Sequence, residues 1–185
     1  MLFRSEAHFD SLSFAAADCP HAAYLRFRWY VEVFFILLFS PLLLSVTFVV
    51  ALVVLFDTGL PILYFQDRPG RNGKIFRIAK FRTMRNRIVE DEKVTVDNDP
   101  RVTKYGAFLR LHRLDEIPQF WNVLRGQMSI IGPRPEPYYA AREYSVTVPH
   151  YTERYAIAPG ITGWQQVMQG HVNTYEGTCR SEEHT

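Results

Sequence analysis

The chain has 185 residues, a formal net charge of +2 and a composition that is 48% hydrophobic. This length allows one domain of ordinary size and a short additional segment, and it excludes two full hydrophobic cores. Two cysteines near opposite ends, without a Cys-x-x-Cys pair or a histidine cluster, argue against a disulfide framework and a zinc site. Charge and hydropathy are distributed unevenly along the chain, so we consider its segments in order.

An uncharged apolar run, residues 33–56, follows a leader or interfacial segment formed by residues 1–32. A straight helix of this length spans about 36 Å, more than the ~30 Å hydrocarbon core of a bilayer. Ser40 and Pro41 lie inside the run, and proline removes a backbone hydrogen bond and clashes with the preceding turn. The run is therefore predicted to enter a membrane as a broken or bent helix.

Basic residues flank both ends of this run, which favours keeping both ends on the cytoplasmic side. A single span cannot satisfy that preference, whereas a re-entrant hairpin can. The N-terminal flank also carries four acidic residues, which weaken the charge asymmetry. Charge and the proline alone favour neither the spanning nor the re-entrant arrangement.

A strongly basic segment follows the apolar run. Residues 60–65 predict a short buried strand, residues 68–73 a glycine-rich turn, and residues 74–84 a strand or hairpin. Eight lysines and arginines, and no acid, lie between Arg68 and Arg87. Such a segment can lie against anionic lipid headgroups or bind phosphate groups, and nucleic acid is not favoured as a partner beside a membrane helix.

Two helices are predicted after an exposed acidic loop at residues 90–100. Thr103 is expected to cap a helix that ends near His112, and a second helix is expected to begin at Asp115 and to end at a Gly126 C-cap. The residues predicted on their buried sides are Tyr105, Phe108 and Leu109 in the first helix, and Ile117, Phe120, Trp121 and Leu124 in the second.

Asp115 and Glu116 stand side by side at the predicted start of the second helix. As structural residues, Asp115 would be an N-cap and Glu116 would complement the helix dipole, and the pattern alone favours this interpretation. The same position suits catalysis, because a helix N-terminus binds phosphate and an ionised carboxylate there can bind a divalent cation or attack phosphorus.

Two turns follow the second helix. Residues 130–135 predict a rigid turn that presents Arg134 between two prolines, either as an exposed side chain or as a phosphate ligand held at low entropic cost. Residues 159–163 predict another turn, and residues 136–156 a surface helix with a loop. The tyrosines of this last region are expected to pack or to lie at a membrane interface.

These segments, in this order and spacing, resemble the bacterial sugar transferase family, the monotopic polyprenyl-phosphate phosphoglycosyl transferases. The matching pieces are the Ser40-Pro41 break, YFQDRPGRNGKIFRIAKFRTM, DPRVTKYGAFLR, LDEIPQFWNVLRGQMSIIGPRP and PGITGWQQV. The resemblance implies an α+β, mainly helical protein at the bacterial inner membrane. A re-entrant membrane helix, residues 33–56, would precede a small cytoplasmic catalytic domain with short strands, residues 57–179.

The resemblance also implies an activity: transfer of a sugar-1-phosphate from a UDP-sugar to a polyprenyl phosphate with release of UMP. This reaction initiates exopolysaccharide, O-antigen or glycoconjugate assembly in the family. Asp115 would be the nucleophile that forms a covalent phosphosugar intermediate, and Asp115 and Glu116 would bind Mg²⁺. The residues assigned to phosphate or nucleotide binding are Arg68, Lys80, Arg82 and Arg134. Neither the sugar nor the oligomeric state is predicted.

Two features depart from the family pattern. Gln127 replaces an aspartate, which puts a subsidiary polar contact in question. Residues 180–185, RSEEHT, have no apolar period, and we interpret them as a non-native tail on a natural protein that continues further. Two alternatives to the transferase therefore stay open: an inactive membrane-associated, lipid-binding remnant, and another magnesium-dependent phosphotransferase.

Overall fold

The computed structural model describes residues 22–85 and 99–163, and it confirms a mainly helical protein with short strands. Three predicted segments lie outside the described residues: residues 1–21 of the leader, most of the acidic loop, and the tail at residues 180–185. In chain order the elements are α2 (Ala22–Leu38), α3 (Ser40–Thr58), β1 (Leu63–Pro69), η1 (Arg71–Gly73), β2 (Ile75–Phe81), α4 (Lys104–Leu111), η2 (Leu114–Gln119), α5 (Phe120–Leu124), β3 (Ser129–Ile131), α6 (Tyr138–Thr147), η3 (Tyr151–Ala156) and β4 (Gly160–Thr162).

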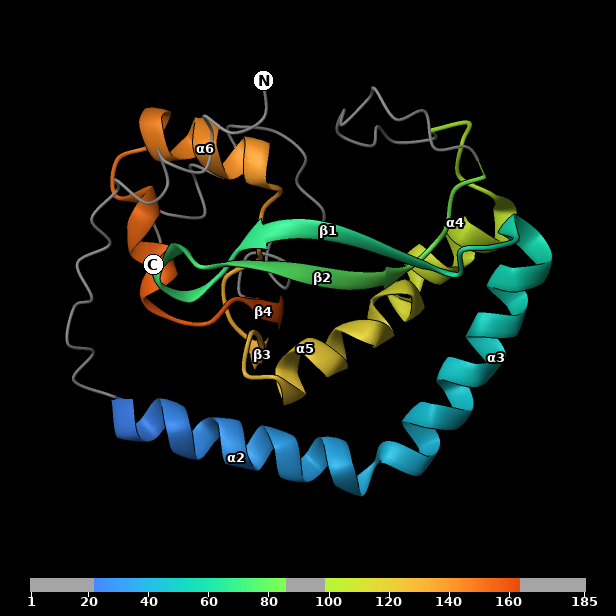
Figure 1. Cartoon of the computed structure of the whole chain (residues 1–185), viewed down its shortest axis with the longest axis horizontal. Helices are drawn as coiled ribbons and strands as arrows, with labels where there is room; N and C mark the ends of the chain where they lie inside the picture. Colours follow the sequence, from blue (N-terminus) through green and yellow to red (C-terminus); the bar gives the residue numbers. More distant parts are fainter. Residues whose placement is uncertain (1–21, 86–98, 164–185) are drawn as a thin grey trace.

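The predicted break in the apolar helix is confirmed. Helix α2 ends at Leu38 and α3 begins at Ser40, with Pro41 in the first turn, where its missing N–H costs nothing. The Ser40 hydroxyl donates to the Leu37 carbonyl at 2.7 Å. The two helices meet at an angle (Figure 1). Among the described residues, α3 is the one helix long and apolar enough to cross a membrane.

The predicted boundary at residues 32 and 33 does not coincide with the end of any element. Helix α2 already begins at Ala22, so residues 22–32 are its first three turns rather than a separate leader. The charge of Glu32 suggested a boundary, but this side chain is buried and accepts a hydrogen bond from Ser129. A buried, paired carboxylate does not interrupt a helix.

Strands β1 and β2 form an antiparallel hairpin with Leu63 opposite Phe81 and Pro69 opposite Ile75. The strand predicted at residues 60–65 therefore starts three residues too early, and it is not buried, because Leu60 and Phe65 are exposed. The turn sets the register: the Gly70 N–H donates to the Lys74 carbonyl at 2.9 Å. The polar residues 66–68 and Pro69 therefore belong to the strand.

Both arms of the broken helix pack against the same body. Ile36 of α2 belongs to a buried cluster with β2 and the α5–β3 region, and Val50 and Val54 of α3 belong to a second cluster with Phe81 and Leu109. In Figure 1, α2 lies across α5 and β3 from the hairpin, α3 runs past the end of the hairpin beside α4, and α6 lies on the hairpin's other side. The apolar side chains on the other faces of both helices are exposed.

Helix α4 begins where the sequence predicts. The Thr103 hydroxyl accepts a hydrogen bond from the Gly106 N–H at 2.8 Å, so the predicted cap is confirmed. The predicted buried side is correct only for Leu109, because Tyr105 and Phe108 are exposed. The face that packs inward contains Gly106, whose missing side chain lets the helix approach the Thr83 carbonyl.

The second helix was predicted as one α-helix, and this prediction is wrong for its first part. Residues 114–119 form a 3₁₀ helix, η2, and α5 begins only at Phe120. Asp115 is not the N-cap, because that position belongs to Arg113 in the left-handed region, with φ 54°. The tighter 3₁₀ winding rotates the following face, so Trp121 is 61% exposed. Gly126, with φ 69°, ends the helix as predicted.

A short parallel pair, β3 and β4, brings the two predicted turns together. Ser129 lies opposite Gly160, and Ile131 opposite Thr162. The Gly132 N–H donates to the Thr162 carbonyl, and the Gly160 N–H donates to the Pro133 carbonyl, both at 2.9 Å. The turn that carries Arg134 therefore rests on β4.

The region after this turn forms helix α6 and the 3₁₀ helix η3, as predicted for a surface helix with a loop. Its tyrosines pack as expected, since Tyr151 and Tyr155 are buried against Ala141.

We expect Gly160→Ala to destabilise the protein by about 3 kcal/mol, since overpacking against a rigid backbone has no cheap relief. A Cβ at this position would collide with the Gly132 backbone nitrogen and lie 2.6 Å from its Cα. Thermal unfolding in detergent measures the effect. Gly70→Ala is the comparison, because its Cβ would come no closer than 3.0 Å to the Phe76 side chain and 3.2 Å to the Lys74 carbonyl oxygen. Equal melting temperatures for both variants would show that the approach of Gly160 to Gly132 is unimportant.

Candidate functional site

Glu116 lies at the centre of a group of cations from different elements. The Lys80 ammonium, on β2, donates to Glu116 Oε1 at 2.7 Å. Arg134, from the turn after β3, has a nitrogen 3.5 Å from the same oxygen, and Arg113 has a nitrogen 3.7 Å from Oε2. Glu116 is only 7% exposed, so these charges act through a medium that screens them weakly.

Burial and charge act in opposite directions on the two carboxylates. Burial alone would raise the pKa of Glu116, but Lys80 and Arg134 hold that pKa at about 2. Burial raises the pKa of Asp115, and the neighbouring charge of Glu116 adds to this effect, while Lys80 and Arg110 lower the Asp115 pKa. Glu116 is therefore the stably ionised, paired member of the dyad, and Asp115 is the less compensated one.

Lys80 is the most closely placed cation. Burial lowers its pKa, and the adjacent Glu116 carboxylate raises it. Glu116 therefore favours the charged form of Lys80.

Arg68 supports the turn that carries Arg134. It donates to the Pro135 carbonyl and, at 2.7 Å, to Gln66 Oε1. Burial lowers its pKa to about 10, and the positive charge of Arg134 acts in the same direction. This side chain thus lies close to Arg134, and both arginines line a hollow beside Glu116.

The structure places Arg82 apart from this group. Its guanidinium donates to the backbone carbonyls of Met84 at 2.9 Å, Leu60 at 3.1 Å and Arg85. These contacts join the end of β2 to the segment after α3. The assignment of Arg82 to phosphate binding stays a prediction, whereas Arg68, Lys80 and Arg134 are brought together.

A shallow hollow, open to solvent, lies beside Glu116. Its polar lining comes from Arg68, Lys80, Glu116, Gln119 and Arg134. Asp115 does not line this hollow, although it adjoins Glu116 on η2.

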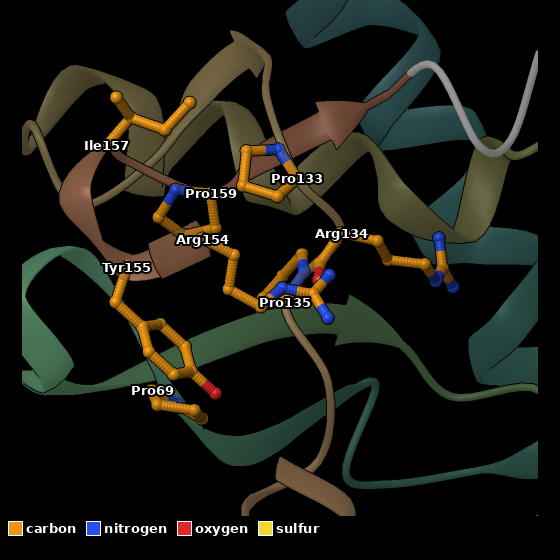
Figure 2. Close-up of a pocket in the computed structure, with 8 residues that line it drawn as sticks. All are labelled: Pro69, Pro133, Arg134, Pro135, Arg154, Tyr155, Ile157 and Pro159. Carbon is orange, nitrogen blue, oxygen red and sulfur yellow. The ribbon is translucent and has the colours of Figure 1, made fainter. Parts of the chain in front are cut away.

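A second hollow lies on the other side of the proline-rich turn and shares Arg134 with the first. It is lined by the proline rings around Tyr155 and Arg154, and Figure 2 shows the Arg134 side chain extending away from Tyr155 and Pro69. The Arg154 guanidinium donates to the Arg134 carbonyl at 3.0 Å, which fixes the turn from this side.

Gln127, where the family pattern has an aspartate, makes a side-chain hydrogen bond. Asn122 Nδ2 donates to Gln127 Oε1 at 2.9 Å and to the Arg77 carbonyl at 2.8 Å. The amide side chain thus joins the end of α5 to β2 through Asn122, and the loss of the aspartate's own contact stays a prediction.

Sequence reasoning did not single out Arg110 and Arg113. Arg113 pairs with Glu116, and burial lowers the pKa of Arg110 while Asp115 raises it. The signal was available, since Arg110 and Arg113 precede the dyad by five and two positions. With Arg68, Lys80 and Arg134 they make five cations near the two carboxylates, and Glu136 and Asp99 also act on Arg68 and Arg110. The cations outnumber these acids, which suits an anionic substrate.

Two carboxylates are the available metal ligands. No group of three or more His, Cys, Asp or Glu side chains forms a metal site within residues 22–85 and 99–163. Mg²⁺ suits such a sparse set, because it commonly takes one or two carboxylates and completes its shell with water and substrate phosphate oxygens. Glu116 Oε2 is buried and makes no hydrogen bond to the described residues, so this oxygen and Asp115 fit that role.

The depressed pKa of Glu116 predicts an acid dependence of stability. A carboxyl group whose pKa is about 2 in the folded state and 4.5 otherwise stabilises the fold above pH 4.5, and this contribution is lost as the pH falls towards 2. The melting temperature should therefore fall more steeply with acid in the wild type than in Glu116→Gln. If the melting temperatures of the wild type and Glu116→Gln fall equally between pH 6 and 3, the prediction is wrong. Asp115, whose raised pKa has the opposite effect, is present in both proteins, and Glu116→Gln removes the part of its shift that the Glu116 charge causes.

Comparison with known proteins gives a consistent pattern. A family profile described as "Bacterial sugar transferase" matches residues 23–183. The chain is 39% identical over 148 residues, 80% of its length, to "UDP-N-acetylgalactosamine-undecaprenyl-phosphate N-acetylgalactosaminephosphotransferase" of Aeromonas hydrophila. It is 42% identical over 146 residues, 76% of its length, to "UDP-glucose:undecaprenyl-phosphate glucose-1-phosphate transferase" of Escherichia coli (strain K12).

A third relative is shorter. The "Exopolysaccharide production protein PSS" of Rhizobium leguminosarum bv. phaseoli is 41% identical over 137 residues, 71% of this chain. The chain spans 34% of the Aeromonas protein, 30% of the Escherichia protein and 66% of the Rhizobium protein. The matched range of the family profile, residues 23–183, contains the dyad and its cations.

Proposed function

Because the chain belongs to the bacterial sugar transferase family, we propose that it transfers a sugar-1-phosphate from a UDP-sugar to a polyprenyl phosphate and releases UMP. One observation carries this proposal: a buried carboxylate pair lies among five cations, at the segment that matches the family. A diphosphate and a phosphate monoester are both anionic, and such a site favours their binding. In the polysaccharide pathways that its relatives serve, this reaction would be the initiating step.

The chemistry takes place in two displacements. Asp115 attacks the phosphorus next to the sugar, a bond from phosphorus to the Asp115 carboxylate forms, and the bond to the bridging oxygen breaks, so UMP leaves with that electron pair. A phosphate oxygen of the polyprenyl phosphate then attacks the same phosphorus and releases the carboxylate. Asp115 suits the attacking role because its charge is the less compensated of the pair.

The surrounding residues offset charge. Lys80 and Arg134 lie at Glu116 and would contact the phosphate oxygens, and Arg68 keeps the Arg134 turn in place. Mg²⁺, when bound by Asp115 and Glu116, would neutralise diphosphate charge so that an anionic nucleophile can approach it. Glu116 in turn raises the pKa of the buried Lys80 and so favours its protonated form.

We extend the proposal to the membrane. The N-terminal arm α2 and the C-terminal end of α3 pack on one body, which supports a re-entrant helix better than a span that separates its ends. Large exposed apolar side chains, among them Phe34, Leu38, Phe48 and Phe56, lie on both arms, where acyl chains would cover them. The dyad would then work at the cytoplasmic face of a bacterial inner membrane.

The experiment that tests the function measures UMP. The purified chain is incubated with Mg²⁺, a short polyprenyl phosphate, and either UDP-glucose or UDP-N-acetylgalactosamine, and UMP release and lipid-linked sugar are quantified together. UMP and lipid-linked sugar in equal amounts support the transferase. Lipid binding without UMP release supports the inactive remnant. Phosphate transfer that does not form a lipid-linked sugar supports another phosphotransferase.

A further inference from the structure

Helix α2 is joined to the body of the protein by a polar triad in which Glu32 and Ser129 are buried and Arg28 is partly exposed. The Ser129 hydroxyl donates to Glu32 Oε1 at 2.6 Å and accepts from the Arg28 guanidinium at 2.6 Å. The Arg28 guanidinium also lies 3.5 Å from Glu32 Oε1. Glu32 and Ser129 are 8% and 3% exposed. A buried charge tolerates little displacement, because loss of a partner leaves it uncompensated.

The triad acts on the strand that leads directly to Arg134. Ser129 opens β3, and Arg28 also donates to the carbonyl of Ile131, the last residue of that strand, at 3.2 Å. Only Gly132 and Pro133 separate Ile131 from Arg134. The position of α2 therefore restrains both ends of β3.

The same helix turn also contacts the segment that carries the dyad. Trp29 Nε1 donates to the Val123 carbonyl at 2.9 Å, and Val123 lies on α5, which continues η2. Thus adjacent residues of α2 contact both the strand before Arg134 and the helix after Glu116. These are the two parts whose separation determines the 3.5 Å distance between Arg134 and Glu116.

We propose that α2 positions the site: Arg28, Glu32 and Ser129 form a latch that holds β3 so that Arg134 stays beside Glu116. The effect of the latch on the KM for UDP-sugar rests on the proposed function. The alternative is that the latch only stabilises the fold and that β4 and Arg154 alone position the turn. Under the proposal, a substitution in the latch displaces Arg134 from Glu116. Under the alternative, the same substitution lowers stability and leaves Arg134 in place.

The kinetic test uses Ser129→Ala, which removes the hydroxyl shared by Arg28 and Glu32, and Glu32→Gln, which removes the charge but keeps the shape. Each should raise the KM for UDP-sugar about tenfold with a kcat changed less than about twofold, because Arg134 contributes binding to ground and transition states alike. Glu143→Gln, an exposed change on α6, is the matched control and should be unchanged.

A double-mutant cycle separates positioning from stability. If the latch acts through Arg134, then Ser129→Ala should change KM less than about twofold in an Arg134→Ala background. Fully additive losses in the cycle would overturn the proposal. If Ser129→Ala does not fold, Glu32→Gln takes its place in the same cycle.

A measurement independent of activity keeps this inference distinct from the proposed function. Hydrogen exchange of residues 129–135 should be faster in Ser129→Ala than in the wild type, while α6 stays unchanged. If the wild type releases no UMP but residues 129–135 still exchange faster in Ser129→Ala than in the wild type, the result counts against the function and supports the latch. An active enzyme whose variants keep the wild-type KM and the wild-type exchange would overturn the latch and leave the function standing.

Discussion

Asp115→Asn is expected to abolish sugar-1-phosphate transfer, with a loss of at least about 10³-fold in the rate of UMP release. The substitution replaces the attacking carboxylate with an amide that cannot form the phosphosugar intermediate. The fold should be retained, because Asp115 is not the N-cap of a helix and the side chain stays polar and similar in shape. Rates measured with both UDP-sugars, together with melting temperatures, check both parts of this expectation.

The control for Asp115→Asn is Asp67→Asn, which changes an exposed carboxylate paired with Arg77 on the hairpin. This variant should keep wild-type turnover. Substantial UMP release by Asp115→Asn, at a tenth of the wild-type rate or more, would return Asp115 to a structural role. A large fall in its melting temperature would show that the buried carboxylate contributes to folding.

Glu116→Gln is expected to lower kcat/KM about 10²-fold and to change its pH dependence. Burial already lowers the pKa of Lys80, and Glu116 is the charge that raises it. Without that charge the Lys80 pKa falls further, so Lys80 loses its proton at a lower pH. Activity that needs protonated Lys80 should therefore disappear at a lower pH in the variant than in the wild type.

The pH profile distinguishes this cause from simple loss of a metal ligand. Excess Mg²⁺ should restore activity if only metal affinity is reduced, whereas the basic limb should stay displaced if Lys80 is affected. Glu153→Gln, which changes an exposed carboxylate beside His150, serves as the control. A Glu116→Gln profile of wild-type shape at every Mg²⁺ concentration would exclude the proposed coupling to Lys80.

Local rules predicted the elements that depend on local chemistry. The break at Ser40 and Pro41, the Thr103 cap and the glycine at 126 all appear where proline, hydroxyl and glycine chemistry places them. The strand at residues 60–65 was wrong because its register depends on pairing with β2 across the turn at Gly70. Pairing is a tertiary property, and hydrophobicity alone does not determine it.

The site was predictable in part. The order of motifs singled out Asp115, Glu116 and Arg134, but their helix pattern alone favoured a cap. That interpretation failed because η2 is a 3₁₀ helix that begins after Arg113. The structure adds the electrostatic asymmetry of the dyad, which depends on Lys80, 36 positions from Glu116. A pattern of neighbouring residues cannot predict a contact between side chains so far apart in the sequence.

The latch could not have been predicted from sequence. Glu32 marked the edge of an apolar run, and its partner Ser129 lies 97 positions away. A charge beside an apolar run is ordinarily a flanking charge at a membrane surface. Only the packing of α2 against β3 shows that this carboxylate is buried and paired.

Mass spectrometry of the acid-quenched enzyme tests the proposed mechanism most directly. The wild type, incubated with Mg²⁺ and a UDP-sugar that it uses, without polyprenyl phosphate, should gain the mass of one sugar phosphate on the peptide that contains Asp115. Asp115→Asn should gain none, and added polyprenyl phosphate should remove the adduct from the wild type. UMP release without an adduct, or the same adduct on the Asp115→Asn protein, would contradict a mechanism in which Asp115 is the nucleophile.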